Sequence, residues 1–223
     1  MSGDSESPQV PELILAALDT TILDAWAPVG SDLPWVRTHS GSILDVPCDA
    51  VVSPSNSFGF LDGGIDLIYS HYFGWGVQDR LQERIRARHD GELLVGRAEI
   101  VPTGDEAIPY LISAPTMRVP QPLGDSIHPY LAARAVLLLW RDGTFSEGEA
   151  EGRPVREVVH RIAVPGLGTG TGQVSPDAFC RQLRAAIDDV ILVGTSFPQT
   201  WIDAAVRHAK LTGAQIVFGD GEA

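Results

Sequence analysis

The chain has 223 residues, of which 44% are hydrophobic and 20% are charged, and 29 Asp and Glu against 16 Lys and Arg give a net charge of −13. This composition excludes a disordered chain and fits one substantial globular domain. The negative charge argues against non-specific binding to nucleic acid or to an anionic membrane, whereas local hydrogen-bond donors can still bind a small anion.

Apolar and turn-forming segments alternate along the chain and predict an α/β layered sandwich. Residues 1–11, rich in Ser, Pro and acids, are expected to form a flexible tail before a single domain over 12–223. The Gly- and Glu-rich segment 142–154 has almost nothing to bury and is expected to be an exposed, mobile connection. Short apolar runs predict strands at 13–18, 35–38, 49–53, 93–101, 110–113, 155–165 and 215–219. Helical periodicity predicts helices at 20–27, 65–89 with a break near Gly74, 127–140, 176–190 and 200–211.

The cysteine content and the N-terminal sequence indicate the cellular compartment in which the protein is expected. Cys48 and Cys180 are too few for a disulfide framework and lack metal-ligand spacing, so no metal site and no cofactor are expected. The acidic N-terminus does not resemble a secretory signal, and the longest apolar run, 135–140, is far shorter than a membrane span. We therefore expect a soluble protein of the reducing cytoplasm that does not bind membranes.

Two loops each follow a predicted strand and open a predicted helix, which is where ligands bind in layered α/β folds. Residues 165–172 read PGLGTGTG, with four glycines in seven positions ahead of a helix start at Ser175. Glycines let the backbone approach a ligand closely, and free N–H groups at a helix start suit a phosphate, although a merely flexible turn has the same composition. The loop lacks the Gly-Lys-Ser/Thr of a P-loop and does not match the dinucleotide fingerprint.

The other loop has a distinctive order of residues. Residues 49–56 read DAVVSPSN and residues 63–66 read GGID, so that Asp66 lies ten residues after Asn56, and Gly74 follows eight residues later. This resembles the macro domain family, in which a strand ends in Asp-Ala-Ile-Val-Asn-Ala-Ala-Asn and a glycine run then leads to Val-Asp at a helix start. The loop at 165–172 is similar to the family's second glycine-rich loop, and the resemblance covers about residues 35–190.

The resemblance implies a three-layer α/β/α sandwich with a mixed central sheet and a cleft for ADP-ribose. It implies that Asn56 holds the distal ribose and that Asp66 positions the water that attacks the anomeric carbon, roles that suit an amide and a carboxylate. From the residues alone, Asn56 could instead be a turn residue, and Asp66 a helix acid that offsets the dipole. The residues implied to bind the ligand are Ser42, Ile43, Ser55, Phe58, Gly63, Gly64, Ile65, Gly166, Leu167, Gly168, Thr169, Gly170, Thr171 and Gly172.

Four positions depart from the family's pattern. Ser42 stands where many members have an aspartate that contacts adenine. Gly172 replaces the aromatic residue that packs on the distal ribose, a place that one of the two phenylalanines in 58–60 could take. Ser53 replaces the first asparagine at the strand end, and Asp62 interrupts the glycine run.

The leading hypothesis is an ADP-ribose-binding macro domain that hydrolyses ADP-ribosyl linkages. Its substrate would be a mono-ADP-ribosylated protein or nucleic acid, or a small derivative such as ADP-ribose 1″-phosphate. The alternative is a non-catalytic reader of ADP-ribose or phosphate, which would keep its affinity without the Asp66 carboxylate. A third hypothesis, an NAD-linked enzyme, would need a site for a redox partner, and the sequence indicates none. The expected partner is ADP-ribose or an ADP-ribosylated substrate.

Overall fold

The strands form one mixed sheet. The computed structural model describes residues 10–194 and 196–214. Its strands are β1 (Glu12–Ala17), β2 (Val36–Ser40), β3 (Ala50–Ser53), β4 (Glu99–Pro102), β5 (Tyr110–Ser113) and β6 (Arg161–Val164). They pair in the order β2-β1-β6-β3-β5-β4. β4 runs antiparallel to β5 at one edge, and every other pair is parallel, so the mixed sheet that the sequence predicts is confirmed.

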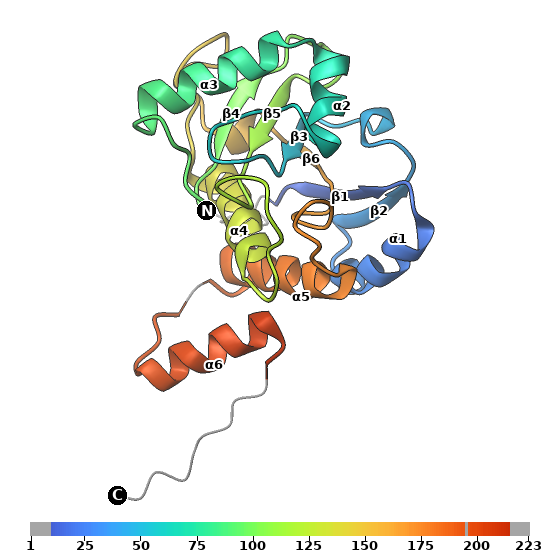
Figure 1. Ribbon diagram of the computed structural model, residues 1–223, viewed down its shortest axis with the longest axis vertical. Helices are drawn as coiled ribbons and strands as arrows, with labels where there is room; N and C mark the ends of the chain where they lie inside the picture. The colour runs from blue at the N-terminus through green and yellow to red at the C-terminus, as the bar shows by residue number, and fades with distance from the viewer. Residues whose placement is uncertain (1–9, 195, 215–223) are drawn as a thin grey trace, which may run out of the picture.

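Helices cover both faces of this sheet. They are α1 (Thr20–Trp26), α2 (Gly64–Phe73), α3 (Gly76–Arg88), α4 (His128–Asp142), α5 (Pro176–Ile187) and α6 (Trp201–Thr212). Figure 1 shows α2 and α3 on one face and α1, α4 and α5 on the other, with α6 beyond α5. The arrangement is the three-layer α/β/α sandwich that the sequence predicts.

Successive residues of the central strands face opposite helix layers, because side chains alternate along a strand. On β1, Leu13 and Leu15 belong to a buried cluster that includes Trp26 of α1 and residues of α4 and α5. Their neighbour Ile14 belongs to a second cluster with Leu81 of α3. A strand that is buried on both faces has a continuous apolar sequence, which is why this run predicts a strand.

The helix ends follow local sequence signals. α5 begins at Pro176, and Oγ of Ser175 accepts a hydrogen bond from the N–H of Ala178 at 3.2 Å. The long helical segment divides at Gly74, whose φ of 79° ends α2 before α3 begins. The first turn of α2 therefore lies at the end of the loop that follows β3, and Asp66 lies in that turn.

Two predicted strands are shorter than expected, because their backbone groups pair elsewhere. Within 93–101 only β4 joins the sheet, and the N–H of Leu93 donates to a loop carbonyl at 2.8 Å. Within 155–165 only β6 does so, and the carbonyl of Val159 accepts a hydrogen bond from Nε1 of Trp140 at 2.8 Å. Apolar runs in these segments indicate burial, and only part of each run pairs with a neighbouring strand.

The segment 142–154 is packed against the body, and the expectation that it has almost nothing to bury is wrong. Phe145 is 6% exposed, and its ring centre lies 4.9 Å from that of Tyr110 at the start of β5. The N–H of Phe145 donates to the carbonyl of Arg153 at 3.0 Å, and the N–H of Gly152 donates to the carbonyl of Phe145 at 2.9 Å. These bonds fold the segment back on itself, and the buried ring anchors it.

The structure describes only part of the segments predicted at the two ends of the chain. Pro11, just before β1, is buried, so the expected flexible tail does not extend to this residue. Residues 1–9 and the predicted strand at 215–219 lie outside the described residues. Near the other end, Nε of Arg181 on α5 donates to the carbonyl of Leu211 on α6 at 3.2 Å. Among the described helices, none is both long and apolar enough to cross a membrane.

Candidate functional site

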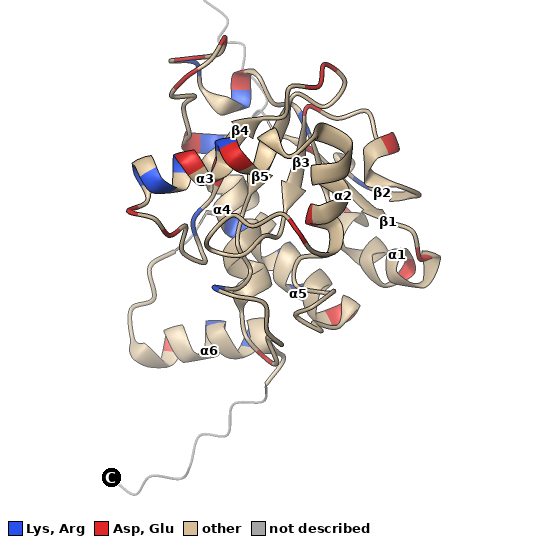
Figure 2. Ribbon diagram, turned by 45° about the horizontal axis from the view of Figure 1, so that its top comes forward, with Lys and Arg blue, Asp and Glu red and all other residues tan. Residues whose placement is uncertain are grey.

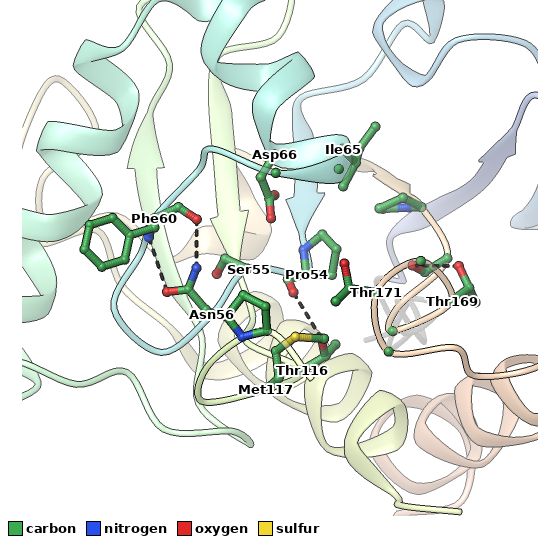
Figure 3. A pocket seen from close by; sticks show the side chains of 18 of the residues that line it. Pro54, Ser55, Asn56, Phe60, Ile65, Asp66, Thr116, Met117, Thr169 and Thr171 are labelled. Atoms are coloured by element: carbon green, nitrogen blue, oxygen red, sulfur yellow. Dashed lines mark hydrogen bonds between the residues drawn. The ribbon is translucent and has the colours of Figure 1, made fainter. Parts of the chain in front are cut away.

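A cavity of about 270 Å³ lies at one edge of the sheet, where three neighbouring parallel strands end. Its walls come from the loops that follow β3, β5 and β6. Because parallel strands present their carboxyl ends at the same edge, these loops meet although they are far apart in sequence. Figure 3 shows Pro54 and Asn56 from the first loop, Thr116 and Met117 from the second, and the loop that carries Thr171 around this cavity.

Most of the residues that the sequence predicts for the site lie together on the cavity wall. They come from the two glycine-containing loops, after β3 and after β6, and from the first turn of α2. They are Ser55, Asn56, Gly63, Gly64, Ile65, Asp66, Gly166, Gly168, Thr169, Gly170, Thr171 and Gly172.

Four predicted ligand-binding residues lie off the cavity wall. Ser42 caps a single 3-10 turn, and Ile43 in that turn is 4% exposed within the apolar core. Leu167 is fully buried and fixes the glycine-rich loop to the core. The Phe58 ring packs under the guanidinium group of Arg118, 5.1 Å from the ring centre.

The sequence reasoning omitted the third wall, which comes from the loop after β5. The signal for it was the position of β5, a buried strand whose carboxyl end must lie at the same sheet edge as that of β3. Ser57 N–H donates to the carbonyl of Met117 at 3.1 Å, and Oγ1 of Thr116 donates to the carbonyl of Pro54 at 3.1 Å, so the two loops are joined. The wall residues outside the predicted ligand set are Pro54, Phe60, Asp62, Thr116, Met117, Pro120 and Pro165.

The amide of Asn56 shapes its own loop. Its Nδ2 donates to the carbonyl of Phe60 at 2.9 Å, and its Oδ1 accepts from the N–H of Phe58 at 3.0 Å, as Figure 3 shows for the Phe60 contacts. This is the behaviour expected of a turn residue. One amide hydrogen is left for a ligand, because the NH₂ group has two and the structure uses one.

Asp66 is a buried carboxyl group on the cavity wall. It is 8% exposed, and its Oδ1 accepts a hydrogen bond from Oγ of Ser53 at 2.6 Å. Burial raises the pKa of Asp66 to about 7, against the lowering effect of the Ser53 hydrogen bond, and the charge of Asp62 adds to the rise. Asp66 can therefore gain and lose a proton near neutral pH, as a general base requires.

The loop after β6 presents backbone donors. Among the described residues, none accepts a hydrogen bond from the backbone N–H groups of 166–172. The loop is tightly folded, since a Cβ at Gly172 would lie 2.5 Å from the carbonyl oxygen of Gly168. At Gly170, by contrast, a Cβ would meet no atom within 4 Å. The backbone is thus compact, and Gly170 borders open space.

The cavity wall carries negative but no positive side chains. Asp62 and Asp66 line it, and no Lys or Arg is among the wall residues. Arg118 lies beside the site and is paired with Glu92, with Nε 2.7 Å from Oε1. Figure 2 shows charged residues of both signs along α3. The hydrogen-bond donors that the described wall offers are therefore neutral: backbone N–H groups, hydroxyl groups and the amide of Asn56.

No protein-family model matches the chain. An uncharacterized protein of Aquifex aeolicus (strain VF5) is 26% identical over 148 residues, which cover 66% of this chain and 78% of that protein. The macrodomain of Mycobacterium tuberculosis DarG is 20% identical, with a TM-score of 0.54, over 70% of this chain and 91% of that chain.

The Oceanobacillus iheyensis macrodomain has been solved in several forms. A mutant with ADPR is 16% identical, with a TM-score of 0.53, over 78% of this chain and 89% of that chain. The same macrodomain with ADP is 18% identical, with a TM-score of 0.52, over 78% and 87%. These likenesses agree with the mixed sheet and its helix layers. The chain therefore has the macrodomain fold.

Proposed function

We propose that this protein binds ADP-ribose in the cavity and hydrolyses ADP-ribosyl linkages there. The observation that carries the proposal is the pairing, across one cavity, of free backbone N–H groups at 166–172 with the buried carboxyl group of Asp66. The solved O. iheyensis macrodomain structures with ADPR and with ADP support a nucleotide ligand for this fold.

The phosphates of the ligand would lie against the loop after β6. Successive N–H groups at a helix start favour an anion through their aligned dipoles, and the loop leads directly into α5. This source of affinity needs no cation and suits a wall without Lys or Arg. The ribose at the far end of the pyrophosphate would then lie near Asn56 and the first turn of α2.

Hydrolysis would proceed by attack of water on the anomeric carbon of this ribose. Ionised Asp66 accepts a proton from the water while the oxygen of the water forms the new bond to carbon. The bond from carbon to the leaving group breaks, and its electron pair leaves with that group, which takes up a proton. The products are free ADP-ribose and the unmodified carrier, or phosphate where the substrate is the 1″-phosphate.

A non-catalytic reader is the second candidate. The observation that favours it is the amide of Asn56, which is engaged with its own loop and has one hydrogen left for ribose. In a reader, Asp66 would serve only as a first-turn acid of α2 and a cavity wall. The two functions differ in what the loss of the carboxylate does.

The first experiment is calorimetry of the wild-type protein with ADP-ribose. We expect micromolar affinity, which corresponds to roughly −8 kcal/mol. The absence of saturation at millimolar ligand would contradict binding in either candidate function.

The second experiment separates the two candidates. Proteins carrying ADP-ribose on Asp, Glu or Ser, modified nucleic acid and ADP-ribose 1″-phosphate are incubated with wild type and with Asp66→Ala, and release of ADP-ribose is measured. For a hydrolase, Asp66→Ala abolishes turnover and changes ADP-ribose affinity by less than about tenfold. If wild type releases ADP-ribose from none of these, the reader function replaces the hydrolase.

A further inference from the structure

The hydroxyl group of Ser53 lies directly behind the carboxyl group of Asp66. Ser53 is the last residue of β3, a strand that pairs with β6 on one side and β5 on the other, and it is fully buried. Its Oγ donates to Oδ1 of Asp66 at 2.6 Å, and no wall of the cavity includes Ser53. Ser53 therefore touches the proposed base without touching the ligand space.

This contact makes the two oxygens of Asp66 different. Oδ1 is held by Ser53 against the sheet. Oδ2 accepts no hydrogen bond from the described residues. It is also not among the described side-chain atoms that are both fully buried and without a hydrogen-bond partner, so it is accessible from the cavity that Asp66 lines. A carboxylate held by one oxygen and open at the other is oriented toward a water in the cavity.

The neighbouring side chains of Asp62 and Tyr69 do not orient the carboxyl group of Asp66. Asp62, in the loop before α2, repels the negative charge of Asp66. Tyr69, one turn further along α2, is fully buried, but its hydroxyl donates to the carbonyl of Val52 at 3.1 Å. In the described part of the chain, Ser53 is thus the one group that donates a hydrogen bond to Asp66.

We propose that Ser53 is a positioning residue for the hydrolysis proposed above, fixing Oδ1 of Asp66 so that Oδ2 faces the attacking water. The inference rests on the proposed function. It gives a role to Ser53, which stands where the macro domain pattern has an asparagine.

The test is a pH titration of Asp66 in the full chain without ligand, measured by NMR of its carboxyl carbon. Loss of the hydrogen bond removes a contact that favours the ionised form. Ser53→Ala should therefore move the midpoint to higher pH and lower the ionised fraction of Asp66 at neutral pH by about fivefold. Where a substrate is turned over, the rate at neutral pH should fall by a similar factor and recover at high pH, with ADP-ribose affinity at high pH unchanged.

Ser113→Ala is the matched control. Ser113 lies opposite Ser53 in the β3–β5 register, is equally buried, and its hydroxyl also makes a 2.6 Å hydrogen bond, but with Ser55. It should leave the titration of Asp66 where it is in wild type. Equal shifts in Ser53→Ala and Ser113→Ala would mean a general loosening of the sheet and would overturn the proposal.

If Ser53→Ala does not fold, a second substitution at the same position provides the test. Ser53→Cys is nearly the same size and puts a weak donor in place of the hydroxyl, so its midpoint should also move to higher pH. A midpoint equal to that of wild type in the variant that folds would overturn the proposal. Turnover with an unchanged pH profile in Ser53→Ala would overturn this inference alone, whereas absence of ADP-ribose binding would overturn the proposed function.

Discussion

At the scale of single residues, the chemistry of the cavity depends on one carboxyl group in surroundings that oppose its ionisation. Burial of Asp66 and the nearby charge of Asp62 outweigh the Ser53 hydrogen bond and raise the pKa of Asp66 from 3.8 to about 7. A base with this pKa is partly ionised at neutral pH and accepts a proton readily. The same burial means that the folded protein becomes less stable when Asp66 ionises.

Asp66→Asn should stabilise the protein at alkaline pH. The pKa of Asp66 is higher in the folded than in the unfolded state, so its contribution to stability is fully present below about pH 3.8 and is lost as the pH rises through about 7. Asparagine has no proton to lose, and its oxygen can still accept from Ser53. In urea denaturation, the gain in unfolding free energy of the variant over wild type should grow by on the order of 2–4 kcal/mol between about pH 3.5 and about pH 8.5. If the difference in unfolding free energy between variant and wild type does not change with pH, the prediction is contradicted.

Asp62→Asn should move the rise of hydrolysis to lower pH. The Asp62 carboxylate raises the pKa of Asp66, so removing its charge favours the ionised base. Because Asp62 is exposed and screened by solvent, we expect roughly a two- to threefold higher rate near pH 6. Initial rates of ADP-ribose release over a pH series measure the effect, and high salt should reduce it. A midpoint that stays in place or moves upward would show that Asp62 does not influence the base.

Residue spacing in the sequence predicts well which side chains line the cavity. It predicts less well which atoms of those side chains face the cavity. Asn56 and Asp66, ten residues apart, both lie on the wall. The amide of Asn56 turns into its loop because the backbone of 57–60 brings a carbonyl and N–H groups within reach, which is the turn role that the residue type allows beside the ribose contact. The contact of Asp66 with Ser53 depends on how α2 packs against β3, which is a tertiary relation.

At the scale of elements, the helices and the loops that open them were the most predictable parts. A capping serine with a following proline predicts the start of α5, and Gly74 predicts the division between α2 and α3. The strands β4 and β6 were less predictable, because periodicity alone does not distinguish a short buried strand from a buried helical segment, such as the 3-10 turn at Val155–Glu157. The loop after β5 has no run of glycines and no side-chain cap at the start of α4, so only sheet order shows that it belongs to the site.

Gly170→Val tests the loop after β6. A side chain there meets no protein atom within 4 Å of Cβ, so the fold should be retained while the added methyl groups occupy the space expected for the pyrophosphate. We expect ADP-ribose binding to weaken by more than 2 kcal/mol, on the order of thirtyfold or worse, in calorimetry.

Arg118→Ala is the control for that prediction. The Arg118 side chain is exposed and paired with Glu92 outside the cavity, so its loss should weaken binding by less than about fivefold. If Arg118→Ala abolishes binding while Gly170→Val leaves it intact, a charged side chain binds the phosphate and the proposed placement is wrong.

At the scale of the whole molecule, a net charge of −13 coexists with a cavity proposed for an anionic ligand. The two are compatible because the long-range field of the protein is screened within about 10 Å at 0.1 M salt, whereas backbone dipoles act at contact distance. The layered α/β architecture follows from alternating apolar helices and strands, which is why the residues alone predict it, whereas the mixed sheet and its three layers are implied by the resemblance to the macro domain family.

ADP-ribose affinity should depend little on salt. With no Lys or Arg on the cavity wall, binding releases no counterions from paired cations, and salt only reduces the repulsion from the acidic surface. Calorimetry at about 50 mM and about 500 mM NaCl should give dissociation constants within about threefold, with any change toward tighter binding at high salt. A tenfold weakening at high salt would point to a cationic site.

The hydrogen bonding of the sheet and of the glycine-rich loop has a consequence for motion. β3 pairs with β6 only at Ala50 and Val51, whereas Ser53 pairs with β5, and its carbonyl accepts a hydrogen bond from the N–H of Ala114 at 2.9 Å. The backbone that carries Ser53 should therefore open to solvent only when β3 and β5 separate. The N–H groups of 166–172 have no such partners in the described chain, so those at the exposed positions 170 and 171 should exchange with solvent without any unfolding. The backbone behind Asp66 should therefore exchange its hydrogens only as the sheet opens, whereas the exposed N–H groups of the glycine-rich loop should exchange in a much shorter time.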